Sequence, residues 1–307
     1  MKLLVPFELE ERYKKIGREI VGSENIIWFP DKGIADVLLV RGNDFPRDQK
    51  FKLIQTVSAG TDHIDLSNIP EDTVIASNAG AYSVSVAEHA FALMLERSKK
   101  ISIFEAETRS GVYKPKSTRL LYGKTLGIIG YGGIGSRSAL IAKSLGMRVI
   151  AVGRGYRDGN ADVFTGMEGL DRLLTESDFI LISIPLTEST LGLIGEEQLE
   201  KVKRNCTIVN VARPEIVRKE SLLKFVDRNR EASYLTDVWW EEPRLEDSKH
   251  ENIVITPHIA GGLSGEVMEF SYVQAFENVK RFMEGLKPNN IVKRGESLYL
   301  NREKIGI

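Results

Sequence analysis

Short apolar runs alternate with longer polar segments along most of the chain. Between residues 125 and 256 these runs are rich in Val, Ile and Leu, and the segments between them are long enough for helices. Such runs are typical of parallel strands that are buried on both faces of a sheet. The pattern predicts a doubly wound α/β domain with strands at Thr125–Ile129, Arg148–Val152, Phe179–Ile184, Cys206–Val211, Tyr234–Val238 and Ile253–Thr256.

The beginning of the chain repeats this alternation on a smaller scale. Its apolar runs predict a second, small α/β unit with strands at Leu3–Val5, Ile26–Phe29, Asp36–Val40, Phe51–Val57 and Val74–Ala76. A long helical pattern follows from Ser83 to about Lys100, and the polar stretch Arg109–Lys116 after it is typical of a domain boundary. The helical segment Glu266–Leu286 has the length to return to the first unit. We therefore expect one domain from residues 1–97 and 262–307, and another from 98–261.

A glycine-rich turn stands between the first strand and the first helix of the larger domain. It reads Gly130, Tyr131, Gly132, Gly133, Ile134, Gly135, and a helical pattern follows from Ser136. Glycines at this spacing permit a tight turn, close approach of a pyrophosphate and close packing of helix on strand. The strand–turn–helix context makes the motif specific. The sequence therefore predicts a dinucleotide site at Gly130, Gly132, Gly133, Ile134 and Gly135.

The end of the second strand bears on which dinucleotide is bound. An NAD site usually has Asp or Glu about 20 residues past the glycines, whereas this chain has Gly153, Arg154 and Gly155, with Arg157 close behind. A guanidinium can pair with a 2′-phosphate through two parallel hydrogen bonds. We expect NADP(H) to be preferred and NAD(H) to be possible. The alternative is that Arg154 is a solvated loop residue and Asp158 binds the ribose.

Composition and charge limit the class of partner and the compartment. The chain has 307 residues, a formal net charge of −1 and no long basic run, which argues against nucleic acid or an anionic membrane. No apolar stretch is long enough to cross a bilayer. The single cysteine, Cys206, falls in a predicted buried strand, and no cluster of His and Cys predicts a metal site. We expect a cytoplasmic protein with a small-molecule partner.

Three residue types suited to carbonyl reduction follow three of the predicted strands. Arg213, Glu242 and His258 come after the strands that end near Val211, Val238 and Thr256. Ligands of an open parallel sheet bind beyond the carboxyl ends of its strands. A histidine can donate a proton to a carbonyl oxygen, a carboxylate can stabilise its imidazolium, and an arginine can hold a carboxylate or carbonyl. These residues predict hydride transfer to a 2-oxo acid.

At this point the chain resembles the D-isomer-specific 2-hydroxyacid dehydrogenase family over nearly all of its length. Ser58–Asp65 is similar to the family's substrate loop, Ala81–Glu88 to the start of its interdomain helix, and Leu121–Gly130 to the entry into its cofactor domain. The resemblance implies a Rossmann cofactor domain and a flavodoxin-like substrate domain. It also implies a homodimer through the cofactor domains, and Gly153–Arg154 resembles the NADP-dependent glyoxylate and hydroxypyruvate reductase branch.

The resemblance also implies roles for individual residues. Arg213, Glu242 and His258 take the catalytic roles, and Arg213 also binds substrate together with the backbone amides of Ala59 and Gly60. The residues implied to line the cofactor, beyond the glycine turn and Arg154, are Pro185, Thr190, Val211, Ala212 and Asp237.

Two departures from the family pattern keep a second function open. The family usually has Gly after its catalytic Arg and an acidic residue four positions later, whereas this chain has Pro214 and Arg218. Proline fixes its own φ and restricts the residue before it, so Arg213 could be aimed differently. The alternative is a nucleotide-sensing, corepressor-like protein with little catalysis.

Several other side chains have open or unremarkable interpretations. Glu241 competes with Glu242 for contact with the histidine ring. His89, on the predicted long helix, is interpreted as a packing or interface residue, His63 stays undecided and His250 is expected to be solvated.

Overall fold

The computed structural model describes residues 1–43, 45–65, 69–155, 159–245, 250–262 and 265–293. The chain divides into two compact units, residues 1–82 with 262–307, and residues 83–261. The first boundary between the units falls between residues 82 and 83, before the long helix, whereas the sequence-based expectation placed it after residue 97. The reason is packing, because this helix, α2 (Ser83–Lys99), lies against elements of the second unit.

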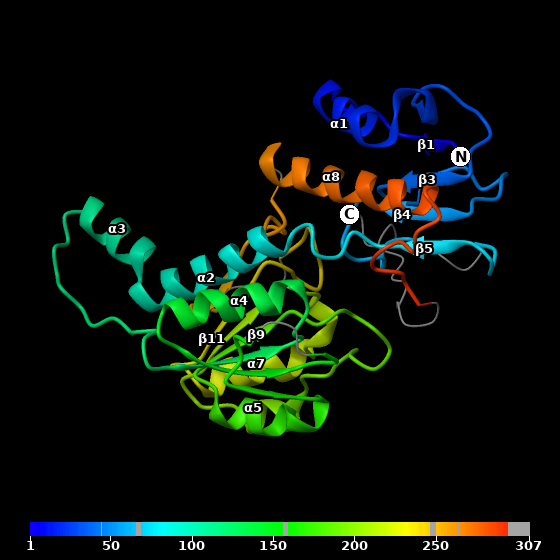
Figure 1. The fold of residues 1–307 in the computed structure, drawn as a ribbon. Coiled ribbons are helices and arrows are strands. Elements are labelled where there is room, and N and C mark those ends of the chain that lie inside the picture. Colours follow the sequence, from blue (N-terminus) through cyan, green and yellow to red (C-terminus); the bar gives the residue numbers. More distant parts are fainter. Residues whose placement is uncertain (44, 66–68, 156–158, 246–249, 263–264, 294–307) are drawn as a thin grey trace. The chain divides into compact units, whose positions relative to one another are not determined.

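The second unit is built on a seven-stranded parallel sheet (Figure 1). Its strand order is β12-β11-β10-β9-β6-β7-β8, so the chain reverses direction across the sheet between β6 and β9. This confirms the doubly wound fold. The strand that the sequence did not predict is the short, half-buried edge strand β8. The strands are β6 (Thr125–Ile129), β7 (Arg148–Val152), β8 (Val163–Thr165), β9 (Phe179–Ile182), β10 (Thr207–Asn210), β11 (Ser233–Thr236) and β12 (Ile253–Ile255).

Helices cover both faces of this sheet. Figure 1 shows α2 and α4 together on one face, with α5 on the other. The strands between these layers are almost entirely buried, which explains their continuous apolar runs. Besides α2, the helices of the unit are α3 (Ile101–Arg109), α4 (Gly133–Ser144), α5 (Leu170–Glu176), α6 (Glu196–Glu200), α7 (Lys219–Arg228) and the 3-10 helices η2 (Met167–Gly169) and η3 (Pro214–Ile216).

The first unit has a five-stranded parallel sheet of order β2-β1-β3-β4-β5. This is the flavodoxin-like strand order, as the resemblance implies. Side chains alternate between the two faces, so Leu3 and Val5 pack under the helices with Tyr272, while Leu4 joins the opposite cluster. The elements are β1 (Leu3–Val5), β2 (Ile26–Trp28), β3 (Val37–Val40), β4 (Leu53–Thr56), β5 (Val74–Ala76), α1 (Glu11–Val21), the 3-10 helix η1 (Ser23–Asn25) and α8 (Gly265–Met283).

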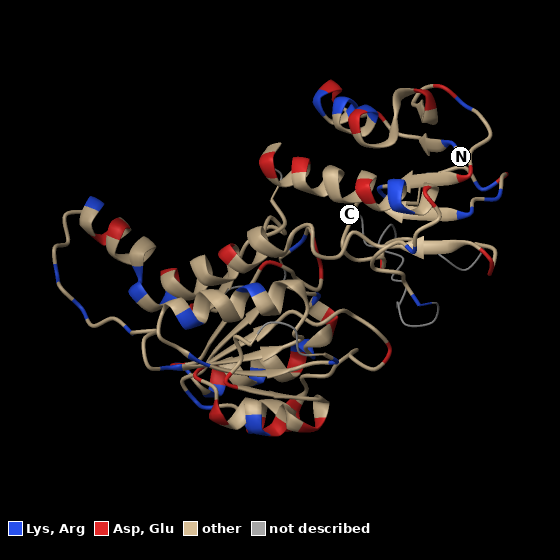
Figure 2. Cartoon of the chain, in the orientation of Figure 1, with Lys and Arg blue, Asp and Glu red and all other residues tan. Residues whose placement is uncertain are grey.

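Charged residues of both signs are interspersed in each unit. Figure 2 shows Lys and Arg mixed with Asp and Glu, for example along α1 and α5. Across the described residues, none of the helices combines the length and the apolar character that a membrane crossing requires.

Candidate active site

The glycine turn leads from β6 into α4. Gly130 has a φ of 99°, and its amide donates to the carbonyl of Val152 on the neighbouring strand at 2.9 Å. A side chain on Gly135 would overlap the carbonyl oxygen of Gly130, whereas one on Gly132 would meet no atom within 4 Å. No side chain caps α4, and the first N–H groups of a helix have no intrahelical partner. The turn therefore leaves space and donors that fit a pyrophosphate at Gly132, Gly133 and Ile134.

Arg154 lies beside this turn. It is exposed and stands two residues after β7, and its neighbour Gly153 approaches Tyr131 so closely that a Cβ on Gly153 would be 3.0 Å from the Tyr131 nitrogen. The guanidinium thus comes from the strand end that adjoins the glycine turn. Arg157 and Asp158, the other residues considered for the ribose end, lie outside the described residues.

The remaining residues implied to line the cofactor follow β9 and β10. Thr190 is buried, and its hydroxyl donates to the carbonyl of Pro185 at 2.7 Å, so it organises the loop that carries the exposed Pro185. Val211 and Ala212 come directly after β10, where the Ala212 amide donates to the side chain of Asn210 at 3.0 Å. These loops leave the same edge of the sheet as the glycine turn, because all of the strands are parallel.

His258 and Glu242 are in direct contact. The Nδ1 atom of His258 lies 3.0 Å from Oε2 of Glu242, and the side chains are 45% and 15% exposed. The other carboxylate oxygen of Glu242 accepts a hydrogen bond from the backbone amide of Trp239 at 2.6 Å. Glu242 is thereby fixed, and the ring it holds remains open to solvent. Such a pair can donate a proton from Nε2 while the carboxylate stabilises the imidazolium.

Glu241 does not share this role. Its Oε1 atom pairs with the ammonium of Lys219, the first residue of α7, at 2.6 Å, while its Oε2 atom is buried without a hydrogen-bond partner. Trp240, the residue before Glu241, donates from its indole Nε1 to the carbonyl of Val217 at 3.1 Å. These two contacts attach the turn that carries Glu242 to the segment that follows Arg213.

Sequence reasoning missed this attachment. Lys219 and Glu241 are 22 residues apart, so their pairing depends on the fold. One local signal was present, because a lysine at the amino end of a helix interacts unfavourably with the helix dipole, and a nearby carboxylate can offset this. That signal does not identify which carboxylate.

Arg213 lies at the end of the neighbouring strand. Its guanidinium donates from Nη1 to the carbonyl of Ala212 at 2.7 Å, and its own carbonyl accepts a hydrogen bond from Asn210 Nδ2 at 3.0 Å. Asn210 is fully buried and also donates to the hydroxyl of Tyr234 at 3.1 Å, where burial raises the pKa of the phenol to about 12. A buried amide therefore sets the turn that carries Arg213.

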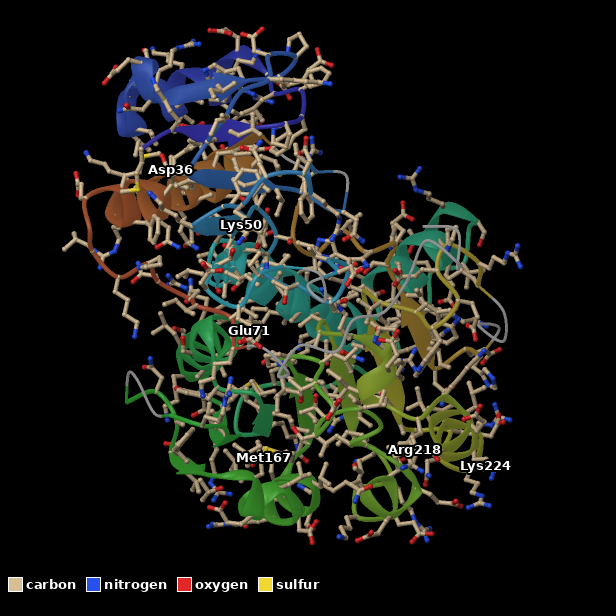
Figure 3. The ribbon with its side chains drawn as sticks, turned by 90° about the vertical axis from the view of Figure 1, so that its right-hand side faces the viewer. Asp36, Lys50, Glu71, Met167, Arg218 and Lys224 are labelled. Atoms are coloured by element: carbon tan, nitrogen blue, oxygen red, sulfur yellow. The ribbon has the colours of Figure 1, made fainter. Side chains whose placement is uncertain are left out.

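The two departures from the family pattern have separate surroundings. Pro214 is buried and opens η3, and Arg213 before it is extended with φ −142° and ψ 142°. Arg218 is exposed (Figure 3), and its stem lies along Gly192 and Gly195, where a Cβ on Gly192 would be 3.0 Å from Arg218 Nε. The guanidinium of Arg218 is thus directed at the preceding loop.

Asp237 has a crowded environment. It is 2% exposed, and its carboxylate accepts hydrogen bonds from the amides of Ile259 and Ala260 at 2.9 and 2.7 Å and from the Thr256 hydroxyl at 2.5 Å. His89 of α2 also contacts this group, with Nε2 at 2.9 Å from Thr256 Oγ1. Sequence reasoning placed His89 in a packing role, and no local signal connects it to residues about 150 positions later, since they meet through the fold.

The expected substrate loop belongs to the first unit and follows β4. Ala59 is exposed, and within the described residues the backbone amides of Ala59 and Gly60 have no hydrogen-bond partner. The loop is shaped by Ser58, whose hydroxyl donates to the Gly60 carbonyl at 2.8 Å and lies 3.3 Å from His63 Nε2. His63 therefore supports the loop, and two free N–H groups are available for an anion.

Two other kinds of site were considered, a reactive thiol at Cys206 and a metal site. Cys206 is buried, and burial raises the pKa of its thiol to about 12, so the unreactive thiol form is favoured. Among the residues that the structure describes, no group of three or more His, Cys, Asp or Glu side chains could hold a metal ion. His250, expected to be solvated, is mostly buried and lies 3.3 Å from Asp227.

Comparison with known proteins identifies the family. Residues 91–260 match the family model of the D-isomer specific 2-hydroxyacid dehydrogenase, NAD binding domain. The chain belongs to this family. The glyoxylate reductase of Thermococcus litoralis is 34% identical over 259 residues, which cover 80% of this chain and 78% of that protein. The glycerate dehydrogenase of Methylorubrum extorquens is 34% identical over 257 residues, 79% of each chain.

Solved structures extend the family relation to the whole fold. A glycerate dehydrogenase related protein from Thermoplasma acidophilum is 42% identical, with a TM-score of 0.73 over 92% of this chain and 100% of that chain. The family resemblance stated from the sequence is thus confirmed, and the larger unit is a nicotinamide-dinucleotide-binding domain.

The geometry of the glycine turn predicts that cofactor affinity and stability can be separated. Gly132→Ala adds a methyl group that meets no protein atom, so the melting temperature should not change, while the dissociation constant for NADPH should rise about tenfold or more because the methyl group occupies the space of the pyrophosphate. Differential scanning fluorimetry and fluorescence titration measure the two effects. Gly135→Ala is the matched comparison: it should lower the melting temperature and raise the dissociation constant for NADPH, because its methyl group would overlap the carbonyl oxygen of Gly130. Unchanged NADPH affinity in Gly132→Ala would place the pyrophosphate elsewhere.

Proposed function

We propose that this protein is an NADPH-dependent reductase that converts a small 2-oxo acid to its D-2-hydroxy acid, with glyoxylate or hydroxypyruvate as the substrate. The observation that carries the proposal is the 3.0 Å contact between His258 Nδ1 and Glu242 Oε2, beside the strand end that bears Arg213. Relatives named glyoxylate reductase and glycerate dehydrogenase support the choice of substrate.

The chemistry divides between the dinucleotide and the protein. A bound nicotinamide dinucleotide would supply the hydride to the carbonyl carbon of the substrate. Because Nδ1 of His258 is engaged by Glu242, Nε2 is the nitrogen that donates a proton to the carbonyl oxygen. Arg213 holds the carboxylate or carbonyl of the substrate and favours the developing negative charge on oxygen. The amides of Ala59 and Gly60 provide donors for the substrate carboxylate.

The preference for NADPH rests on Arg154. This residue stands beside the glycine turn, and residues 153–155 offer no carboxylate to accept bonds from the ribose hydroxyls. The 2′-phosphate carries charge that a guanidinium pairs with well, and a solvent-exposed position suits such a contact. Within this proposal NAD(H) is a weaker cofactor. The single thiol of the sequence is consistent with a cytoplasmic protein.

The alternative of a nucleotide sensor without catalysis is not favoured. It depended on Pro214 misdirecting Arg213, but the extended backbone of Arg213 is the conformation that a following proline prefers. The named relatives are reductases and dehydrogenases.

Replacement of the proposed acid tests the reaction. His258→Gln keeps a polar side chain but removes the ionisable ring, so kcat with glyoxylate or hydroxypyruvate should fall about 10²–10⁴-fold while the dissociation constant for NADPH stays within about twofold. NADPH oxidation at 340 nm, measured with a panel of 2-oxo acids, gives kcat. His250→Gln is the control and should retain activity. Full activity in His258→Gln would exclude this residue as the acid, and NADPH binding by the wild-type protein without turnover on any 2-oxo acid would favour the sensor.

Reversal of the charge at position 154 tests the cofactor. In Arg154→Asp the ratio of kcat/KM for NADPH to that for NADH should fall about ten- to hundredfold, because charge-assisted bonds to the 2′-phosphate are replaced by repulsion. Steady-state kinetics with each cofactor measures this ratio. Arg230→Asp makes the same change on an exposed arginine near the amino end of β11 and should leave the ratio unchanged. An unaltered preference in Arg154→Asp would move 2′-phosphate recognition to another residue.

The proposal includes a homodimer through the cofactor units. Helix α3 has no buried residue, and Figure 1 shows it standing away from the seven-stranded sheet. Apolar side chains are exposed on it and on the segment that follows, namely Ile101, Ile103, Val112, Tyr113 and Leu120. An exposed apolar surface of this kind could be buried against the same surface of a second copy related by a two-fold axis.

Charged substitutions on this surface test the dimer. The wild-type protein should sediment with twice the chain mass of 34.4 kDa, and the double variant Ile103→Lys, Tyr113→Lys should sediment as a monomer because lysines oppose burial of the surface. Ile34→Lys, which changes a residue that is 91% exposed in the other unit, should remain dimeric. A monomeric wild-type protein, or equal dissociation by Ile34→Lys, would contradict the assignment.

A further inference from the structure

One buried carboxylate, that of Asp237, accepts hydrogen bonds from the loop that carries His258. Both residues after His258 donate their amides to Asp237, Ile259 to Oδ1 at 2.9 Å and Ala260 to Oδ2 at 2.7 Å. Before His258, Thr256 donates its hydroxyl to Oδ1 at 2.5 Å. The carboxylate thus binds the loop on both sides of the proposed acid. A buried carboxylate is stable only when donors surround it, and Asp237 has three from this loop alone.

Helix α2 completes the arrangement from the other side. His89 Nε2 lies 2.9 Å from Thr256 Oγ1 and 3.6 Å from Asp237 Oδ1, and the ring is 19% exposed. The hydroxyl of Ser85, one turn earlier on α2, donates to the carbonyl of Ala260 at 2.8 Å. Both ends of the loop therefore contact the same helix, and the histidine contacts the carboxylate and the threonine together.

The available donors and acceptors determine where the hydroxyl hydrogen of Thr256 and the ring hydrogen of His89 lie. A threonine hydroxyl has one hydrogen, and the short distance to Asp237 places it there, since the other acceptor near the hydroxyl, the Thr236 carbonyl, is at 3.5 Å. Thr256 Oγ1 can therefore only accept from His89. The Nε2 atom of His89 must carry a hydrogen, which points at the threonine and toward the carboxylate.

The backbone of His258 explains why this group matters. Its φ is 54°, in the left-handed region that residues other than glycine rarely adopt. Such a conformation persists when the surrounding structure determines it, and it occurs frequently at active sites. Here the amides on its carboxyl side are fixed by Asp237, and the threonine on its amino side is fixed by Asp237 and His89. Loss of a donor from this group would let the loop relax and move the ring away from Glu242.

We propose that His89 is a positioning residue that, through Thr256 and Asp237, holds the loop of residues 256–260 so that His258 stays on Glu242. This inference rests on the proposed function for its kinetic consequence, but its structural consequence is independent of it. His89 does not donate the reacting proton, because its Nε2 hydrogen is used by Thr256 and the more exposed ring is that of His258.

The kinetic test compares two substitutions at one position. His89→Leu removes the donor, so kcat for 2-oxo acid reduction should fall about ten- to hundredfold, as misplacement of a catalytic group by about 1 Å can cause. The dissociation constant for NADPH should stay within about twofold, because the glycine turn is untouched. His89→Gln places an amide donor near the position of Nε2 and should restore kcat to within about threefold of wild type. His250→Leu is the matched control and should retain full activity.

The outcomes that overturn the proposal are specific. Full activity in His89→Leu, an equal loss in His89→Gln, or a parallel loss of NADPH affinity would each reduce His89 to a packing residue. Should His89→Leu fail to fold, Thr256→Val removes the link instead and should show the same fall in kcat with unchanged NADPH affinity. Retained activity in Thr256→Val would also overturn it.

A spectroscopic test separates this proposal from the proposed function. The chain has four histidines, so two-dimensional ¹H–¹⁵N spectra of the rings are simple, and they are recorded on the cofactor-free protein. His89 should carry its hydrogen on Nε2, and His89→Leu should shift the ring signals of His258 while His89→Gln leaves them near wild type. If no 2-oxo acid is reduced but these shifts occur, the reductase assignment fails and the positioning role stands. Unshifted His258 signals in His89→Leu would overturn the positioning role.

Discussion

The parallel pairing of β10, β11 and β12 is the constraint on which the site depends. The last residue of each strand faces the last residue of the next, Asn210 opposite Thr236 and Thr236 opposite Ile255. Because parallel strands in this register end at the same level, the loops that bear Arg213, Glu242 and His258 leave one edge together. The pairing thus places Arg213, Glu242 and His258 on loops at one edge of the sheet, where Glu242 and His258 are in contact. The same edge also receives the glycine turn after β6.

Register alone does not orient a side chain, and polar side chains near the strand ends supply the contacts that do. Asn210 organises the turn of Arg213, the Lys219–Glu241 pair attaches the turn of Glu242, and Asp237 fixes the loop of His258. Asn210 and Asp237 lie at or just past a strand end, where backbone N–H and C=O groups leave the sheet and need partners. The left-handed backbone at His258 costs about 1 kcal/mol or more, so the hydrogen bonds to Asp237 must offset that cost. The histidine proposed as the acid is thus held in place by a carboxylate that is distinct from the one on its ring, Glu242.

The sequence supported the fold and the identity of the proposed site residues because both depend on local pattern. Apolar runs of strand length predicted the parallel sheets, and the strand–turn–helix order made the glycine motif specific. The edge strand β8 escaped prediction because it is short and half-buried, so hydrophobicity does not define it. The membership of α2 in the second unit could not be predicted either, since its apolar face suits either unit and only packing decides. His89 and the Lys219–Glu241 pair are long-range contacts between residues whose local surroundings are unremarkable.

The proline after Arg213 departs from the family pattern but fits the backbone of this turn. Glycine at that position would allow many backbone conformations, whereas Pro214 restricts Arg213 to extended ones, and Arg213 is extended. Proline also suits the first position of a helical turn, where its missing N–H leaves no unpaired donor, and Pro214 opens η3 there. The carbonyl of Arg213 is meanwhile held by Asn210. Pro214 therefore stiffens the turn in the conformation observed at the strand end, and Arg213 follows β10 at the edge of the sheet where His258 and Glu242 meet.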